Sequence, residues 1–244
     1  VLDAFLEDIL VPVPSTREVI LSWFQQAGRK DKGYSVVEKE ISPTGIVNGT
    51  QIQLQSIGLS TDNSKALLGQ IEKLAKERDR TGHVWNEFKA FLAKRKSASP
   101  DERITAVIDG ANIGYYKANF EGAPKHVNYH QIDWVVRRCI KDGEIPLIVL
   151  HSRHVDPKKI PAEYASVVQR WKDEELLYVT PAGSNDDWYW MFIAVFLECR
   201  HIVTNDIMRD HHFLLLSPRW FGRWRERHQV KFSFGKWQQA ERAV

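Results

Sequence analysis

Short, almost unbroken apolar runs mark the second half of the chain. They occupy residues 104–109, 145–151, 176–180 and 201–205. Runs of this length and composition predict strands that are covered on both faces, as in a parallel sheet. Segments with helical spacing separate them, at residues 129–140, 162–175 and 186–198. Because strands alternate with helices, we predict an α/β fold built on a parallel, right-handed sheet.

The first 100 residues follow a different pattern, which predicts a smaller region of helices and antiparallel strands. Apolar residues recur at helical spacing over residues 16–26 and again over residues 67–92, where Gly82 interrupts the second stretch. Short alternating runs over residues 34–59 predict a hairpin or a small antiparallel sheet. A polar segment at residues 96–101 has the composition of a linker and separates this region from the α/β part.

Aspartates follow two of the predicted strands and begin one of the predicted helices. Asp109 ends the first strand, Asp206 follows the fourth, and Asp186 and Asp187 open the helix between the third and fourth. In parallel α/β sheets, ligands bind at the carboxyl ends of the strands. We therefore predict that the four carboxylates converge at this edge. There they would repel one another unless a cation neutralised them.

The chemistry of these four carboxylates points to a hard divalent cation. Oxygen ligands without cysteine favour Mg²⁺ or Mn²⁺ over zinc. Such an ion polarises a phosphate and lowers the pKa of bound water, so a phosphodiester can be hydrolysed without a protein nucleophile. The alternative is structural, because an aspartate after a strand often caps a helix or forms a turn. Four aspartates at the same predicted edge favour the metal site.

Composition and motifs exclude several other classes of protein. A P-loop, a G-x-G-x-x-G loop and a G-x-S-x-G elbow are all absent from the sequence. The net charge of +3 is compatible with an anionic partner but too small to require one. Cys139 and Cys199 form no C-x-x-C pair, so we expect a reducing, intracellular location. No apolar run approaches the ~20 residues of a membrane span. The sequence starts at Val1 with neither an initiator Met nor the charge order of a targeting sequence, so we expect a piece of a longer protein.

Three segments are long enough to compare with known families: Ala106-Val-Ile-Asp-Gly-Ala-Asn-Ile-Gly, Pro181-Ala-Gly-Ser-Asn-Asp-Asp-Trp-Tyr-Trp and Val203-Thr-Asn-Asp-Ile-Met-Arg-Asp-His. They resemble protein-only RNase P, whose nuclease domain belongs to the NYN group of PIN-like folds. The similarity runs from about residue 104 to residue 234 and continues more weakly towards the N-terminus. It implies a PIN-like (NYN) nuclease domain at residues 101–228 and a small central region, mainly β plus helix, at residues 1–100. It also implies that residues 229–244 form a strand returning to the central region.

The resemblance also implies an activity and a site. Enzymes of that family remove the 5′ leader of precursor tRNA, and the aspartates that match Asp109, Asp186, Asp187 and Asp206 hold their catalytic metal ions. We therefore expect a Mg²⁺-dependent endoribonuclease in which Mn²⁺ can substitute, with precursor tRNA as the substrate. Two alternatives stay open: a PIN-like nuclease that acts on another RNA, and a non-catalytic RNA-binding module. The resemblance implies a mitochondrial or nuclear location.

The chain departs from the family pattern in two respects. The family has a zinc site whose first two ligands form a C-x-x-C pair, and the matching positions here are Val47 and Thr50. Neither side chain binds zinc, so zinc is not expected. The family also has an N-terminal array of helical repeats that grips the tRNA. This sequence shows no such period, and we expect the array to be in the full-length protein.

Weaker candidates follow Asp206. We expect Asp210 to bind the metal directly or through another ligand, and His211 and Arg209 to contact the scissile phosphate or the leaving oxygen. The alternative for these residues is a solvated helix turn.

Asn112 is expected to orient Asp109 or to contact RNA. Near the C-terminus, arginines alternate with aromatic residues, which indicates a surface that faces RNA. These arginines are Arg219, Arg223 and Arg225. For Trp188, Trp190, Trp220 and Trp224, burial in the core is the favoured interpretation.

Overall fold

The computed structural model describes residues 13–30, 37–54, 59–77, 83–208 and 220–235. The chain divides into two compact units. The first unit comprises Val1–Leu59 and Pro218–Arg227, and the second comprises Ser60–Ser217 and His228–Val244. Among the described helices, none combines the length and the apolar character needed to cross a bilayer.

The first unit contains helix α2 (Pro14–Lys30) and most of α10 (Trp220–His228). The helix predicted over residues 16–26 is confirmed by α2. Within the predicted antiparallel region, two isolated antiparallel bridges join Ile41 to Val47 and Ile46 to Gln53. In the turn between Ile46 and Gln53, the Thr50 hydroxyl donates a hydrogen bond of 2.8 Å to the backbone oxygen of Val47.

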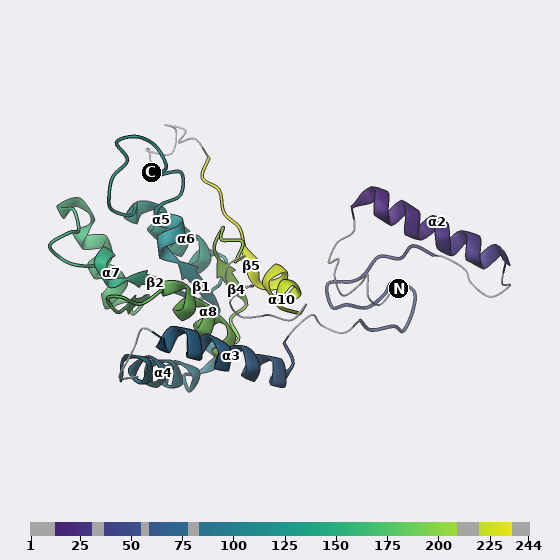
Figure 1. Ribbon diagram of the computed structural model, residues 1–244, viewed down its shortest axis with the longest axis horizontal. Helices are drawn as coiled ribbons and strands as arrows, with labels where there is room; N and C mark the ends of the chain where they lie inside the picture. Colours follow the sequence, from purple (N-terminus) through teal and green to yellow (C-terminus); the bar gives the residue numbers. More distant parts are fainter. Residues whose placement is uncertain (1–12, 31–36, 55–58, 78–82, 209–219, 236–244) are drawn as a thin grey trace. The chain divides into compact units, whose positions relative to one another are not determined.

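The second unit is built on a five-stranded parallel sheet, shown in Figure 1. Its strands are β1 (Ala106–Asp109), β2 (Pro146–His151), β3 (Leu177–Thr180), β4 (His201–Val203) and β5 (Gln229–Val230). They lie in the order β3-β2-β1-β4-β5. The predicted α/β fold with a parallel sheet is thus confirmed, and each of the four predicted strands contains an observed one.

The fifth strand belongs to the parallel sheet. It pairs with β4, through Ile202 to Gln229 and Val203 to Val230. The expected return of residues 229–244 to the central region stays a prediction. Residues 236–244 lie outside the described residues. The other domain limits stay predictions, although the contacts group residues 60–100 with the sheet rather than with the preceding residues.

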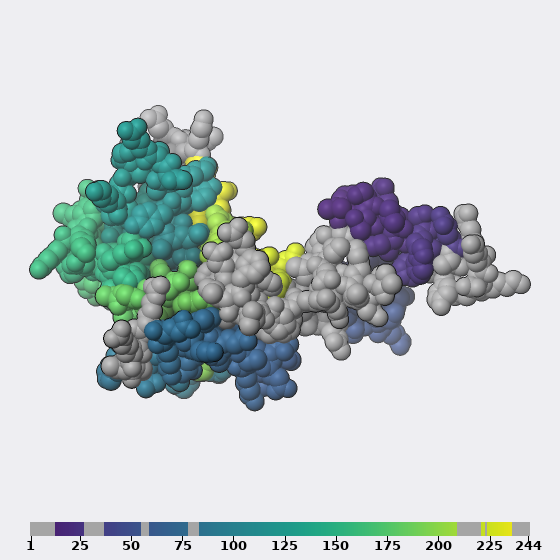
Figure 2. Space-filling view, in the orientation of Figure 1, coloured from purple at the N-terminus to yellow at the C-terminus, as the bar shows by residue number. Residues whose placement is uncertain are grey.

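Helices cover both faces of this sheet. Helices α5 (Gly110–Gly114), α6 (Tyr129–Lys141) and α7 (Ala165–Asp173) pack on one face, and α8 (Asp186–Phe196) packs on the other, against β1 and β2. Helix α3 (Thr61–Lys76) packs on the outer side of α8, with α4 (His83–Lys96) beside it. Figure 2 shows the blue surface of α3 and α4 directly against the green surface around α8. The helical stretch predicted over residues 67–92, with an interruption at Gly82, corresponds to these two helices.

Helix α8 is buried on all sides, which explains its sequence. Every residue from Trp188 to Val195 is buried, because the sheet covers one side of the helix and α3 and α4 cover the other. A helix enclosed in this way needs no polar face. Aromatic rings fill the outer contact, where Trp85 lies 5.1 Å from Phe192 and Phe88 lies 4.7 Å from Tyr189 between ring centroids. Its hydrophobic packing fixes the position of the acidic first turn of α8.

The Gly114→Ala substitution is expected to lower the free energy of unfolding by about 1–3 kcal/mol. A Cβ atom at this position would lie 2.5 Å from Cβ of Val127 and 3.1 Å from Cδ1 of Ile132, both in the core. Gly69→Ala is the matched control, because nothing lies within 4 Å of a Cβ there and α3 should gain about 0.5–1 kcal/mol. Urea denaturation measures both effects. A higher free energy of unfolding for Gly114→Ala would contradict the close packing of Gly114 against Val127 and Ile132.

Candidate metal centre

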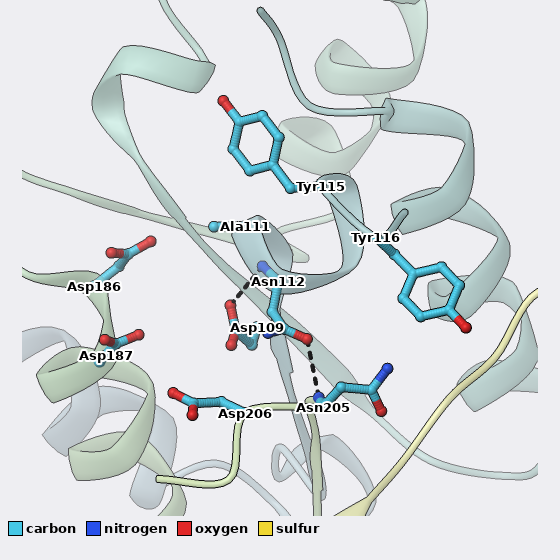
Figure 3. Close-up of a pocket in the computed structure, with 9 residues that line it drawn as sticks. All are labelled: Asp109, Ala111, Asn112, Tyr115, Tyr116, Asp186, Asp187, Asn205 and Asp206. Carbon is cyan, nitrogen blue, oxygen red and sulfur yellow. Dashed lines mark hydrogen bonds between the residues drawn. The ribbon is translucent and has the colours of Figure 1, made fainter. Parts of the chain in front are cut away.

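The four predicted aspartates line one pocket at the carboxyl edge of the sheet. The chain continues from β1 to β2 on one side of β1, and later returns to β4 on the other side. Ligands of α/β proteins bind where the strand order reverses in this way. The pocket has a volume of about 450 Å³ and opens to solvent (Figure 3). Its lining residues are Asp109, Ala111, Asn112, Tyr115, Tyr116, Asp186, Asp187, Asn205 and Asp206.

Asp109 is the most deeply placed carboxylate, with only 4% of its surface exposed. Its Oδ1 accepts a hydrogen bond of 3.0 Å from the backbone N–H of Asn112, and its Oδ2 accepts one of 2.8 Å from the Thr204 hydroxyl. Burial, with a smaller contribution from the charges of Asp187 and Asp186, raises the pKa of Asp109 to about 7 against these two hydrogen bonds. Both hydrogen-bond donors are uncharged, so they hold this carboxylate without neutralising it.

Asp186 and Asp187 occupy the first turn of α8, as the sequence predicts. The Asn185 side chain caps this helix and accepts a hydrogen bond of 3.1 Å from the Asp187 N–H, while Oδ1 of Asp187 accepts one of 3.2 Å from the Trp190 indole. The helix dipole favours negative charge at this end. Burial nevertheless raises the pKa of Asp186, and the neighbouring charge of Asp187 adds to the rise.

Asp206 lies in a loop that Thr204 connects to Asp109. The Thr204 hydroxyl donates to Asp109 and accepts a hydrogen bond of 3.0 Å from the backbone N–H of Asp206. Oδ1 of Asp206 in turn accepts one of 2.8 Å from the Met208 N–H. The Gln229 amide donates to the backbone oxygens of Thr204 and Asp206, at 2.9 and 2.7 Å. One buried hydroxyl therefore sets the relative positions of two carboxylates that are 97 residues apart in sequence, from 109 to 206.

A pair of asparagines joins the same two loops. The Asn112 side-chain oxygen accepts a hydrogen bond of 2.9 Å from the backbone N–H of Asn205, drawn as a dashed line in Figure 3. Asn112 was expected to orient Asp109 or to contact RNA. Its backbone N–H does contact Asp109, whereas its side chain contacts Asn205. Thr204 and Asn205 were not among the predicted site residues, although both directly precede Asp206 in the segment that begins at Val203.

The donor set of this pocket fits a divalent cation by its chemistry, although no closed ligand shell is formed. In the described ranges, no three Asp, Glu, His or Cys side chains stand where they could hold a metal ion together. The four aspartates nevertheless face one pocket, and Figure 3 shows Asp186, Asp187 and Asp206 around Asp109. Burial is the main cause of the raised pKa of Asp109, and the neighbouring charges of Asp187 and Asp186 add to it, so the carboxylates repel one another. A cation that binds oxygen ligands would remove this repulsion.

Most of the weaker candidates cannot be placed beside this pocket. Arg209, Asp210, His211 and Arg219 lie outside the described residues, and so does the side chain of Arg223. Arg225 is half-buried on α10, in the first unit. The expectation that tryptophans are buried is confirmed for Trp188, Trp190 and Trp224.

Comparison with known proteins shows extensive similarity to one family. The family model described as protein-only RNase P matches residues 41–241. Proteinaceous RNase P 2 of Arabidopsis thaliana is 32% identical over 233 residues, covering 90% of this chain and 42% of the relative. Proteinaceous RNase P 1, chloroplastic/mitochondrial, of the same plant is 32% identical over 230 residues, covering 91% and 38%. The chain thus spans about two fifths of the length of these two curated relatives.

A solved structure supports the same relationship. The crystal structure of nuclear proteinaceous RNase P 2 from A. thaliana matches this chain with a TM-score of 0.68 at 30% sequence identity. The match covers 96% of this chain and 53% of the other. The resemblance stated from three sequence segments, and the fold that it implied, are both confirmed.

The Asp109→Asn substitution is expected to stabilise the protein at neutral pH in the absence of divalent cations. The pKa of Asp109 is about 7 in the folded protein, above its ordinary 3.8, so folding takes up a proton between these values. Stability from this group therefore falls as the pH rises from about 4 to about 7. Three pKa units correspond to about 4 kcal/mol, which is the upper limit of the effect. Urea denaturation across this pH range measures it.

The exposed aspartate Asp101 provides the control for this prediction. Asp101→Asn, measured in the same way, removes a carboxylate at the surface instead of the one in the pocket. Parallel pH profiles for wild-type protein and Asp109→Asn would show that the buried carboxylate does not carry the predicted electrostatic strain.

Proposed function

The chain belongs to the protein-only RNase P family, and from this premise we propose that it carries the metal-dependent nuclease site of an enzyme that removes the 5′ leader of precursor tRNA. The two curated relatives are named as proteinaceous RNase P proteins. One observation carries the proposal: aspartates from three separate parts of the chain line one pocket at the edge of the sheet. A hydrolase that cleaves a phosphodiester with the help of a cation needs such a cluster.

Asp109, Asp186, Asp187 and Asp206 are the residues that would hold Mg²⁺, with Mn²⁺ able to substitute. When bound, such an ion polarises the scissile phosphate and activates water for attack. Support for this assignment comes from Asp109, whose two hydrogen-bond donors are uncharged and whose charge is therefore balanced either by a proton or by a cation. Oxygen ligands of this kind favour Mg²⁺ and Mn²⁺.

Residues around the four carboxylates hold them ready for the cation. Thr204 orients Asp109, and the Trp190 indole orients Asp187. The backbone N–H of Met208 does the same for Asp206. Such hydrogen bonds hold each carboxylate in place before a metal ion binds. The carboxylate then loses less freedom on binding, and the affinity for the metal ion increases. The chain's own residues thus position the reacting phosphate indirectly, through fixed carboxylates.

Other parts of the assignment rest on the sequence and the family. We propose that Asp210 and His211 assist at the reacting phosphate, and that RNA is bound by Asn112, Arg209, Arg219, Arg223 and Arg225. Precursor tRNA is proposed as the RNA partner. The names and title of the relatives place those proteins in the nucleus or in chloroplasts and mitochondria, so we propose a nuclear or organellar location for this protein.

Each of the substitutions Asp109→Asn, Asp186→Asn, Asp187→Asn and Asp206→Asn is expected to reduce cleavage by orders of magnitude while the fold persists, because the amide weakens cation binding. Incubation of the full-length protein with 5′-labelled precursor tRNA in Mg²⁺, followed by mapping of the cut, measures the rate and the position. Asp101→Asn is the matched control. Wild-type rates for two or more of the four variants at saturating Mg²⁺ would remove those residues from the site.

Cleavage at low Mg²⁺ concentration is expected to rise with pH through about 7. Below its pKa, Asp109 is protonated and cannot bind a cation, whereas above it the carboxylate is free to do so. Because cation and proton compete for the same oxygens, a higher Mg²⁺ concentration should move the midpoint to lower pH. Rates measured from about pH 5.5 to pH 8.5 at two or more Mg²⁺ concentrations test this. A midpoint pH that stays the same at all Mg²⁺ concentrations would argue against competition between the proton and the cation at Asp109.

A further inference from the structure

A row of aromatic side chains leads away from the aspartate pocket. Tyr116 lines the pocket, on the side opposite Asp186 and Asp187 in Figure 3. Its ring lies 5.5 Å from that of Phe234, and the Phe234 ring lies 5.9 Å from that of Trp134 on α6. The Trp134 side chain is 58% exposed, although most tryptophans bury more of their surface. The row thus connects the lining of the pocket with an exposed indole.

Asn205 fixes this row relative to the aspartates. Its side-chain amide donates a hydrogen bond of 2.9 Å to the backbone oxygen of Phe232 and accepts one of 3.1 Å from the Phe232 N–H. Its own backbone N–H donates to Asn112. The segment that carries Phe232 and Phe234 is therefore joined to the loop that carries Asp206, so the aromatic side chains have a defined place beside the pocket.

Positive charge lies next to the row. The Lys117 ammonium is 5.3 Å from the centroid of the Tyr116 ring, and the Lys117 side chain is exposed. Phe232 and Phe234 pack against the core of the sheet domain and have a structural role in doing so. Trp134 has less of its surface buried than that role would require. Aromatic faces combined with a lysine match the two parts of a nucleotide, because bases stack on rings and phosphates pair with cations.

We propose that Tyr116, Phe234 and Trp134 form a stacking surface for unpaired bases of the RNA strand, a few nucleotides from the phosphate bound at the aspartates. The inference rests on the proposed function and adds to it how the strand is positioned. Bases within an RNA duplex are stacked on one another and cannot reach such a surface, so it selects unpaired nucleotides. Stacking tolerates any base, so the surface positions the strand without reading its sequence.

The test measures binding of precursor tRNA to the full-length protein in Ca²⁺ at constant salt concentration, with a series of RNAs that each lack one base near the cut. Trp134→Ala should weaken binding about 5-fold or more, since stacking of one base contributes a factor of that size. Trp134→Phe should retain most of the affinity. Ile140→Ala is the matched control, because Ile140 is a 49% exposed apolar side chain on the same helix.

A double-mutant cycle identifies the contact itself. The base whose removal weakens binding to wild-type protein should have no further effect on Trp134→Ala, while it keeps its full effect on Ile140→Ala. Thermal unfolding of both variants verifies that the fold is retained.

The possible results separate the two proposals. If Trp134→Ala binds as tightly as Ile140→Ala, or if base removal weakens wild type and Trp134→Ala equally, the stacking surface is wrong. If wild-type protein binds precursor tRNA but does not cleave it in Mg²⁺, the proposed function is wrong and the binding cycle still decides the inference. If wild-type protein does not bind precursor tRNA at all, both are overturned.

Discussion

Parallel pairing of β1 with β4 is the constraint on which the candidate site depends. Ile108 pairs with Val203, so both strands end at the same edge and in the same direction. Asp109 follows directly on one side, and Thr204 follows directly on the other. The hydroxyl of Thr204 can therefore reach Asp109 while it accepts the backbone N–H of Asp206. Without this register, the two carboxylates would have no common support.

Electrostatic strain at this edge is opposed by hydrophobic packing elsewhere. Burying a carboxylate that has only neutral hydrogen-bond donors destabilises the folded state, and the nearby charges of Asp187 and Asp186 add to the effect. The buried helix α8 opposes it, since residues 188–195 are packed on all sides. This packing holds the first turn of α8 against the pocket despite the repulsion. A protein that binds a cation here would gain stability when the cation is present.

The pocket combines two surfaces of different chemistry. Aspartates form one side, and Tyr115 and Tyr116 belong to the rest of the lining. The two sides have a common support, because Asn205 contacts the β1 loop through Asn112 and the C-terminal segment through Phe232. A phosphate group and the nucleotides next to it need these two kinds of surface, the first for charge and the second for stacking.

The sequence by itself determined the alternation of strands and helices, the parallel sheet and the edge at which the aspartates lie. Short apolar runs and helical periods are local signals, and the strand-end positions of Asp109 and Asp206 follow from them. Tertiary structure alone decided the strand order, the place of β5 beside β4, the roles of Thr204 and Asn205, and the raised pKa of Asp109. These features depend on contacts between residues far apart in the chain, and on burial, which a local pattern does not encode. The aromatic row from Tyr116 to Trp134 is of the same kind, because the contacts of Phe234 with both residues arise only when the C-terminal segment packs beside α6.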